Sequence, residues 1–244
     1  MSTNTSNYWA IVPAAGSGSR MGSQCPKQYL PLHGKPILQH TLERLNLSRI
    51  MGIVVCVAEN DLDWKTIKLA DSVIQVNGGT ERCHSVLNGL KALQQRAQPD
   101  DWVLVHDAAR PCVRPADIEK LMTQLADHPV GGLLAVPVRD TMKRAQTIAS
   151  NTHPFWGEKG LEVIETINRE GLWHALTPQM FRLQALTEAL QNVLNRGELV
   201  TDDAQAMEKM GHQPVLIEGH ADNIKITHPQ DLSLAELYMQ EQNL

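Results

Sequence analysis

The sequence predicts an α/β fold in which helices cover a doubly wound, mostly parallel sheet. Short apolar runs rich in Val and Ile recur along the chain, and each is too short for a buried helix. Stretches with the apolar spacing of amphipathic helices lie between these runs. Such alternation is typical of parallel sheets with helices on both faces. At 244 residues, 42% of them hydrophobic, the chain is long enough for one such domain with a substantial core.

The strand-like runs form a series along the chain. The first five are Tyr8–Pro13, Ile53–Ala58, Val73–Val76, Trp102–His106 and Gly132–Val136. Two more strands are predicted near the end, at Pro214–Glu218 and Asn223–Thr227. Helices are predicted after Pro36, around Val86–Leu93, after Pro115, at Arg182–Leu194 and Asp202–Met210, and from Pro229 onward.

The alternation stops between Arg139 and Leu176. This segment contains one proline, three glycines and two short β-prone pieces, and it has no clear helical pattern. A stretch of this length without a helix is unusual for a loop in a compact domain. We therefore predict that residues 139–176 form a projecting β-arm attached to a single domain that spans 1–244.

Composition excludes several classes of protein. Lys and Arg total 22 against 27 Asp and Glu, a formal net charge of −5, so no basic excess exists to hold a nucleic-acid backbone. The four cysteines include no C-x-x-C pair, which argues against a zinc site or a disulfide framework. No signal-peptide pattern opens the chain, and no apolar run approaches the ~20 residues of a membrane span. We expect a cytoplasmic protein that binds neither nucleic acid nor membrane.

A glycine-rich loop follows the first predicted strand. From Pro13 to Gly22 it reads PAAGSGSRMG, and Lys27 follows within the string PKQYL. Backbone N–H groups of small residues can surround phosphate oxygens, and Arg20 and Lys27 add positive charge. The loop lies at the carboxyl edge of the predicted sheet, where open α/β sheets bind ligands. A phosphate-bearing ligand is therefore expected here.

Two other phosphate-binding loops do not fit this spacing. The loop of NAD-dependent oxidoreductases needs glycines in the order G-x-G-x-x-G, but position 21 is Met and the next glycine comes one residue late. A Walker loop needs Gly-Lys followed by Ser or Thr, whereas Lys27 lies between Pro26 and Gln28. The remaining alternative to a phosphate site is a solvated surface turn.

Further motifs follow the loop in a fixed order. They are GGTER at Gly78–Arg82, VHDAARP at Val105–Pro111, and the strings at Pro137–Lys143, Leu172–Gln179, Thr201–Ala204 and Asp222–Thr227. Together with the loop, these strings resemble the 2-C-methyl-D-erythritol 4-phosphate cytidylyltransferases, a family of Rossmann-like nucleotidyltransferases. The resemblance covers nearly the whole chain. Thr80 departs from it, since an Asp is expected there in some relatives.

The resemblance implies an enzyme that couples CTP to a polyol phosphate and releases pyrophosphate, with Mg²⁺ as cofactor. It also implies a homodimer held together by the arm. A phosphate monoester is already largely dianionic at neutral pH, because its second pKa is near ~6, so it needs no strong base. The sequence accordingly offers no persuasive Ser–His–Asp or Cys–His grouping.

Residue roles carry over from the matching motifs. The resemblance implies catalytic roles for Arg20, Lys27, Arg169 and Lys225. It implies nucleotide contacts by Ala14, Ala15, Gly16, Gly18, Gly79, Thr80, Ser85 and Ala108, and polyol-phosphate contacts by Arg110, Thr141, Arg169, Thr177 and Lys225.

Two aspartates are candidate metal ligands. Asp107 directly follows a predicted strand at the ligand-binding edge, and a carboxylate there suits Mg²⁺, which prefers oxygen ligands and triphosphate bridging. Asp222 precedes the predicted strand that carries Lys225 and is a second candidate. The alternative role for Asp107 is to cap a turn or helix.

Two functional alternatives remain open. A pentitol-phosphate cytidylyltransferase would share the loop and the Asp107 motif, although residues 140–143 look more like the methylerythritol enzymes. A catalytically inactive dimeric scaffold would be free to lose Arg20, Lys27, Asp107 and Lys225, but all four are present.

Overall fold

The computed structural model describes residues 6–16, 25–68, 70–149 and 159–242. Along the chain it separates into two compact units. The larger unit comprises the described residues of Met1–Ala135 and Ala175–Leu244, and the smaller unit is Val136–His174. The smaller unit corresponds to the predicted arm, with both boundaries shifted slightly toward the N-terminus.

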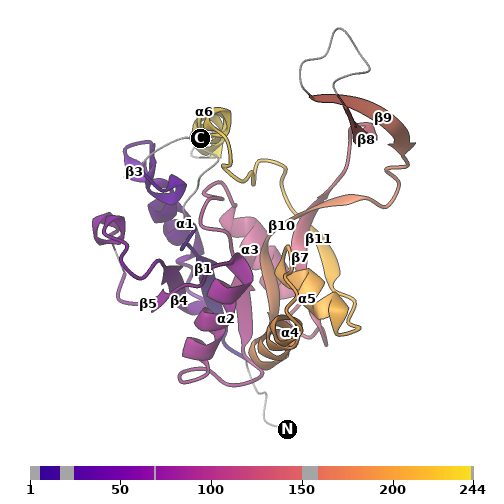
Figure 1. Cartoon of the computed structure of the whole chain (residues 1–244). Coiled ribbons are helices and arrows are strands. Elements are labelled where there is room, and N and C mark those ends of the chain that lie inside the picture. Colours follow the sequence, from indigo (N-terminus) through magenta and orange to yellow (C-terminus); the bar gives the residue numbers. More distant parts are fainter. Residues whose placement is uncertain (1–5, 17–24, 69, 150–158, 243–244) are drawn as a thin grey trace. The chain divides into compact units, whose positions relative to one another are not determined.

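A seven-stranded sheet forms the centre of the larger unit (Figure 1). Its strands lie in the order β11 (Val215–Glu218), β7 (Gly131–Pro137), β10 (Trp173–Arg182), β6 (Trp102–Val105), β1 (Tyr8–Pro13), β4 (Ile50–Val57) and β5 (Val73–Asn77). β1 pairs in parallel with β4 and β6, β4 with β5, and β11 with β7. β10 instead runs antiparallel to β6. The prediction of a mostly parallel sheet is confirmed.

Helices cover both faces of this sheet. They are α1 (Ile37–Leu45), α2 (Arg82–Leu93), α3 (Pro115–Gln124), α4 (Leu183–Asn195), α5 (Asp203–Lys209) and α6 (Pro229–Gln242). α2, α4 and α5 share one buried apolar cluster with Ile11, Val54 and Val103 of the sheet. Because side chains alternate along a strand, the fully buried Ala10 and Val12 point to the opposite face, where α1 packs against β4. The predicted doubly wound arrangement is therefore confirmed.

Short elements complete the larger unit. β2 (Pro31–Leu32) and β3 (Lys35–Pro36) form an antiparallel pair, and single 3₁₀ turns span Lys27–Tyr29 and Asp63–Thr66. Within the described ranges, no helix has the length and apolar character needed to cross a membrane.

Two segments differ from the expectations drawn from the sequence. The sequence does not reveal β10, because Pro178 lies within it and proline is unusual inside a central strand. The predicted strand at Asn223–Thr227 is wrong, since this segment has no strand conformation. It is held instead by contacts such as the one from the Ile226 N–H to the Ala109 carbonyl, at 2.9 Å. This irregular segment nevertheless carries Lys225 to the site described below.

The smaller unit contains an antiparallel pair of strands, as predicted for the arm. β8 (Met142–Ala149) pairs with β9 (Lys159–Ile167). On β9, Leu161, Val163 and Ile164 are 69%, 57% and 54% exposed. Three large apolar side chains exposed so close together are unusual on the surface of a protein that acts alone.

Candidate active site

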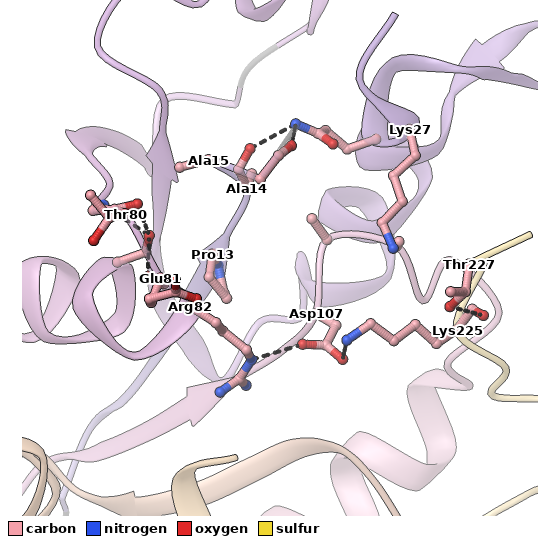
Figure 2. Close-up of a pocket in the computed structure, with 16 residues that line it drawn as sticks. Pro13, Ala14, Ala15, Lys27, Thr80, Glu81, Arg82, Asp107, Lys225 and Thr227 are labelled. Atoms are coloured by element: carbon pink, nitrogen blue, oxygen red, sulfur yellow. Dashed lines mark hydrogen bonds and ion pairs between the residues drawn. The ribbon is translucent and has the colours of Figure 1, made fainter. Parts of the chain in front are cut away.

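A cavity of about 350 Å³ lies at the carboxyl edge of the sheet (Figure 2). Its walls come from the loop after β1, the start of α2, the residues after β6 and the irregular segment before α6. The predicted site residues that line it are Ala14, Ala15, Gly16, Lys27, Gly79, Thr80, Ser85, Asp107, Ala108 and Lys225. The parallel strands thus bring to one place residues that lie far apart in the sequence.

Asp107 lies among three cations. Its Oδ1 accepts from Arg82 Nε at 3.0 Å, and its Oδ2 accepts from Arg110 Nε at 3.2 Å and from Lys225 Nζ at 3.0 Å. Figure 2 shows the carboxylate between the side chains of Arg82 and Lys225. Burial alone would raise the pKa of the Asp107 carboxyl, but the three cations hold this pKa well below its usual value. Asp107 is therefore charged at neutral pH.

These contacts bear on how a metal ion could bind. Both oxygens of Asp107 already accept hydrogen bonds from cationic side chains. In the described parts of the chain, no group of three or more His, Cys, Asp or Glu side chains is arranged to hold a metal ion. Among these residues, Asp107 would therefore bind a divalent ion together with a phosphate ligand and not as part of a cluster of protein ligands.

A hydrogen-bonded relay fixes the backbone beside Asp107. Thr177 Oγ1 accepts from the Asp107 N–H at 3.1 Å and lies 3.0 Å from Nδ1 of the fully buried His106. His106 Nε2 lies 3.1 Å from the Arg110 carbonyl, which can only accept, so this nitrogen carries the ring proton and Nδ1 accepts from the threonine hydroxyl. Burial lowers the pKa of His106 to about 4, which keeps the imidazole neutral. The Thr177 hydroxyl is thereby committed to protein partners.

Lys27 and its neighbour connect the loop to the other walls of the cavity. Lys27 Nζ donates to the Ile226 carbonyl at 2.9 Å. The buried Gln28 donates from Nε2 to the carbonyls of Ala14 at 2.8 Å and Gly16 at 3.1 Å. These two hydrogen bonds fix the direction of the loop backbone. Gln28 is a cavity-lining residue that the sequence analysis missed, although its place in the PKQ string was a signal.

Close packing shapes the wall between β1 and α2. A Cβ on Gly78 would lie 2.4 Å from Ala15 Cβ, and one on Gly79 would lie 2.4 Å from His84 Cβ, so only glycine fits at either position. The Gly79 N–H donates to Ser85 Oγ at 2.9 Å.

Arg82 is the second residue that the sequence analysis missed. It lines the cavity and connects Asp107 to Asp203, with its Nη2 2.8 Å from Asp203 Oδ2. Burial opposes the positive charge, but the two carboxylates raise the pKa of Arg82 above its usual value. Because Asp203 lies 121 residues further along the chain, no local pattern could have revealed this contact.

The remaining predicted residues lie elsewhere. Asp222 does not line the cavity, and its Oδ2 accepts from Arg114 Nη2 at 2.6 Å and from Gln242 Nε2 at 2.9 Å. Thr141 and Arg169 belong to the smaller unit, where Arg169 donates to a backbone carbonyl of the same unit. The predicted contacts at Gly18 and Arg20 fall outside the described residues.

Fold and site together define a class. Cations converge on a cavity at the carboxyl edge of a mostly parallel sheet, and a loop of small residues borders that cavity. This arrangement suits an enzyme that stabilises negative charge while a group is transferred from a nucleotide. The fold and the site are those expected of a nucleotidyltransferase.

Comparisons with known proteins identify the family. The family model for 2-C-methyl-D-erythritol 4-phosphate cytidylyltransferase (IspD) matches residues 8–241. The chain is 50% identical over 242 residues to the enzyme of that name from Vibrio parahaemolyticus, and the match covers 98% of each protein. It is 49% identical over 229 residues to the enzyme of that name from Pseudomonas aeruginosa, a match that covers 92% of this chain and 93% of the relative. The solved structure of the Francisella tularensis enzyme has a TM-score of 0.77 at 34% identity, covering 96% of this chain and 100% of that one. The chain therefore belongs to the 2-C-methyl-D-erythritol 4-phosphate cytidylyltransferase family.

Proposed function

We propose that this chain transfers the cytidylyl group of CTP to 2-C-methyl-D-erythritol 4-phosphate, as a step in isoprenoid precursor synthesis by the non-mevalonate pathway. An oxygen of the phosphate monoester attacks the α-phosphorus of CTP and forms a new P–O bond. The bond from the α-phosphorus to the bridging oxygen breaks, and pyrophosphate leaves. The observation that carries this proposal is the family match over residues 8–241, a range that contains every residue lining the cavity.

Charge neutralisation is the main demand of this reaction, because two anions must approach each other. Lys27, with its Nζ held by the Ile226 carbonyl, places a positive charge at the cavity wall. We assign Lys27 and Arg20 to stabilising the transition state, Lys as a mobile point charge and Arg as a planar fork. The contacts of Ala14, Ala15, Gly16, Gly79 and Ser85 with the cytidine are part of the same proposal, as are those of Gly18, Thr80 and Ala108.

We assign the polyol phosphate to the side of the cavity that holds Lys225. The Lys225 ammonium is oriented by Asp107, and Asp107 is in turn fixed by Arg110 and by the relay through Thr177. In this arrangement Lys225 is the group that meets the substrate phosphate. Arg110 and Thr177, whose polar atoms contact protein groups, act by positioning Asp107.

Magnesium belongs to this proposal as part of the nucleotide substrate. A divalent ion bound with the triphosphate would offset part of the negative charge in this reaction. Asp107 is the one predicted metal ligand that lines the cavity. Asp222 is bound by Arg114 and Gln242, and we do not include it.

We infer that the functional form is a homodimer built through the smaller unit. The exposed Leu161, Val163 and Ile164 of β9 provide an apolar surface that a second copy of the chain can cover. In this dimer, Thr141 and Arg169 reach the polyol phosphate bound to the partner subunit. We place the enzyme in the cytoplasm, since all four cysteines are free thiols, as a reducing compartment requires.

Pyrophosphate release tests this function directly. CTP, UTP, ATP and GTP are each offered with Mg²⁺ and with either 2-C-methyl-D-erythritol 4-phosphate or a pentitol phosphate. We expect turnover with CTP and the methylerythritol phosphate that far exceeds every other combination. Preference for the pentitol phosphate would favour the alternative cytidylyltransferase, and no turnover with any pair would favour a non-catalytic scaffold.

A further inference from the structure

Asp203 is an acidic residue in the larger unit that no proposed substrate contact explains. It is the first residue of α5 and is fully buried, and it does not line the cavity. Burial raises the pKa of its carboxyl, and Arg82 opposes this rise. Its Oδ2 accepts from Arg82 Nη2 at 2.8 Å, while no hydrogen-bond partner for its Oδ1 occurs among the described residues. Among the described residues, the hydrogen bond to Arg82 is therefore the side-chain contact by which Asp203 can act on the site.

The start of α5 is itself held in a fixed place. Gln179 of β10 is buried, and its Oε1 accepts from the Ala204 N–H at 2.8 Å. Its Nε2 donates to Asp202 Oδ2 at 3.0 Å, and Asp202 Oδ1 caps the helix by accepting from the Gln205 N–H at 2.9 Å. The first turn of α5 is thus tied to the central sheet, so Asp203 presents its carboxylate to Arg82 from a rigid support.

Arg82 transmits this support to Asp107. Its Nε and Nη2 lie on one edge of the planar guanidinium, the edge that commonly binds both oxygens of a single carboxylate. Here that edge is divided, with Nη2 bound to Asp203 and Nε bound to Asp107 Oδ1 (Figure 2 shows the second contact). Because Arg82 occupies Oδ1, the other oxygen faces Lys225 and Arg110.

We propose that Asp203 is a positioning residue for catalysis, which fixes the Arg82 guanidinium and through it the rotamer of the Asp107 carboxylate. The proposal rests on the role proposed for Asp107 in orienting Lys225. It also explains the motif Thr201–Ala204, which the proposed substrate contacts leave unused and which supplies Asp203. It gives a role to Gln179 as well, the residue of the motif Leu172–Gln179 that holds α5.

The alternative is that Asp203 only stabilises the fold. A buried ion pair is weak evidence for stability, whereas removal of one partner leaves an uncompensated charge and is destabilising. Stability alone therefore cannot distinguish the two roles. A positioning role predicts a change in kcat in folded enzyme, while a purely structural role predicts a change in the melting temperature alone.

The experiment compares folded variants in steady-state kinetics with CTP and the polyol phosphate. For Asp203→Ala we expect kcat to fall by about 10-fold or more, the scale on which loss of an orienting partner acts, with KM for CTP nearly unchanged. Asp203→Asn keeps an oxygen that can accept from Arg82, so it should retain most of the activity. Asp117→Ala is the matched control, because Asp117 is also a buried aspartate, and it pairs with His220 outside the cavity lining.

A double-mutant cycle tests the route. If Asp203 acts through Arg82, then Asp203→Ala should cost nothing further in an Arg82→Ala background. An undiminished loss in that background would overturn the proposal, as would a kcat for Asp203→Ala that matches Asp117→Ala at the same fraction folded. Wild-type turnover and Asp107→Asn are measured alongside, so that failure of the proposed reaction or of the Asp107 role is separated from failure of this inference.

Discussion

The buried imidazole of His106 predicts a specific dependence of stability on pH. Its pKa in the folded chain is about 4, because burial disfavours the charged ring, whereas an unfolded histidine has a pKa near ~6.5. Between these values the unfolded state binds more protons than the folded state. The free energy of unfolding therefore rises with pH through this window, and this contribution is lost as the pH falls from about 6.5 toward about 4.

The size of the effect follows from the two pKa values. Linkage gives a loss of about 2 kcal/mol from this one group when the pH is lowered from 7.5 to 5.0. His106→Gln removes the titrating ring while keeping an amide that can both donate and accept between Thr177 and the Arg110 carbonyl. The variant should therefore lose less stability on acidification than the wild type does.

Urea unfolding at pH 7.5 and pH 5.0, at one protein concentration, measures this difference. We expect the wild-type drop in unfolding free energy to exceed that of His106→Gln by about 2 kcal/mol. His212→Gln, at an exposed histidine, is the control and should behave like the wild type. Equal drops in wild type and His106→Gln would refute the assignment of a neutral, buried imidazole.

Three further predictions concern catalysis. Lys27→Ala and Arg20→Ala should each lower kcat by at least ~100-fold, with a smaller effect on CTP binding. Steady-state kinetics measures the first effect and equilibrium titration the second. A loss confined to KM would indicate ordinary ground-state binding. Asp107→Asn should abolish most activity, and circular dichroism should show a folded chain. A near-normal rate with unchanged Mg²⁺ dependence would instead indicate that Asp107 only caps a turn or helix. If the two subunits share their sites, a mixed dimer of Lys27→Ala and Arg169→Ala chains has one site with both defects and one intact site. Random exchange makes half the dimers mixed, so mixing should restore up to roughly a quarter of wild-type activity. No recovery, with subunit exchange verified by mass, would contradict the shared site.

Much of the fold could be predicted because each parallel strand is an apolar run of its own. β1 has the bounds that its sequence predicts, and β4, β5 and β6 differ only by a few residues at their ends. β10 could not be found in this way, since it carries Pro178 and its pairing with β6 depends on the fold as a whole. The alternation at Asn223–Thr227 was misleading because a strand also needs a partner, and in the structure none of these five residues has strand conformation.

The candidate site was predictable where its residues belong to compact motifs. The loop after β1 and the Asp107 string place their residues at the cavity. Contacts between distant side chains were not predictable, because nothing in the string TDDA indicates that Asp203 meets Arg82. The same holds for Asp222, whose place in its motif suggested a metal ligand and whose carboxylate instead binds Arg114.

The smaller unit, Val136–His174, is inserted between β7 and β10, which are neighbours in the sheet. Its two connections meet where the Val138 N–H donates to the Leu172 carbonyl at 3.0 Å. A tight turn of about 2–5 residues would suffice to join neighbouring strands, so the sheet itself does not require this segment. Doubling the length of a flexible connection costs only about 0.6 kcal/mol, so its size can change by insertion or deletion at little expense to the catalytic unit. Evolution can therefore remodel the segment as a separate module, constrained by what it binds and not by the sheet that carries it.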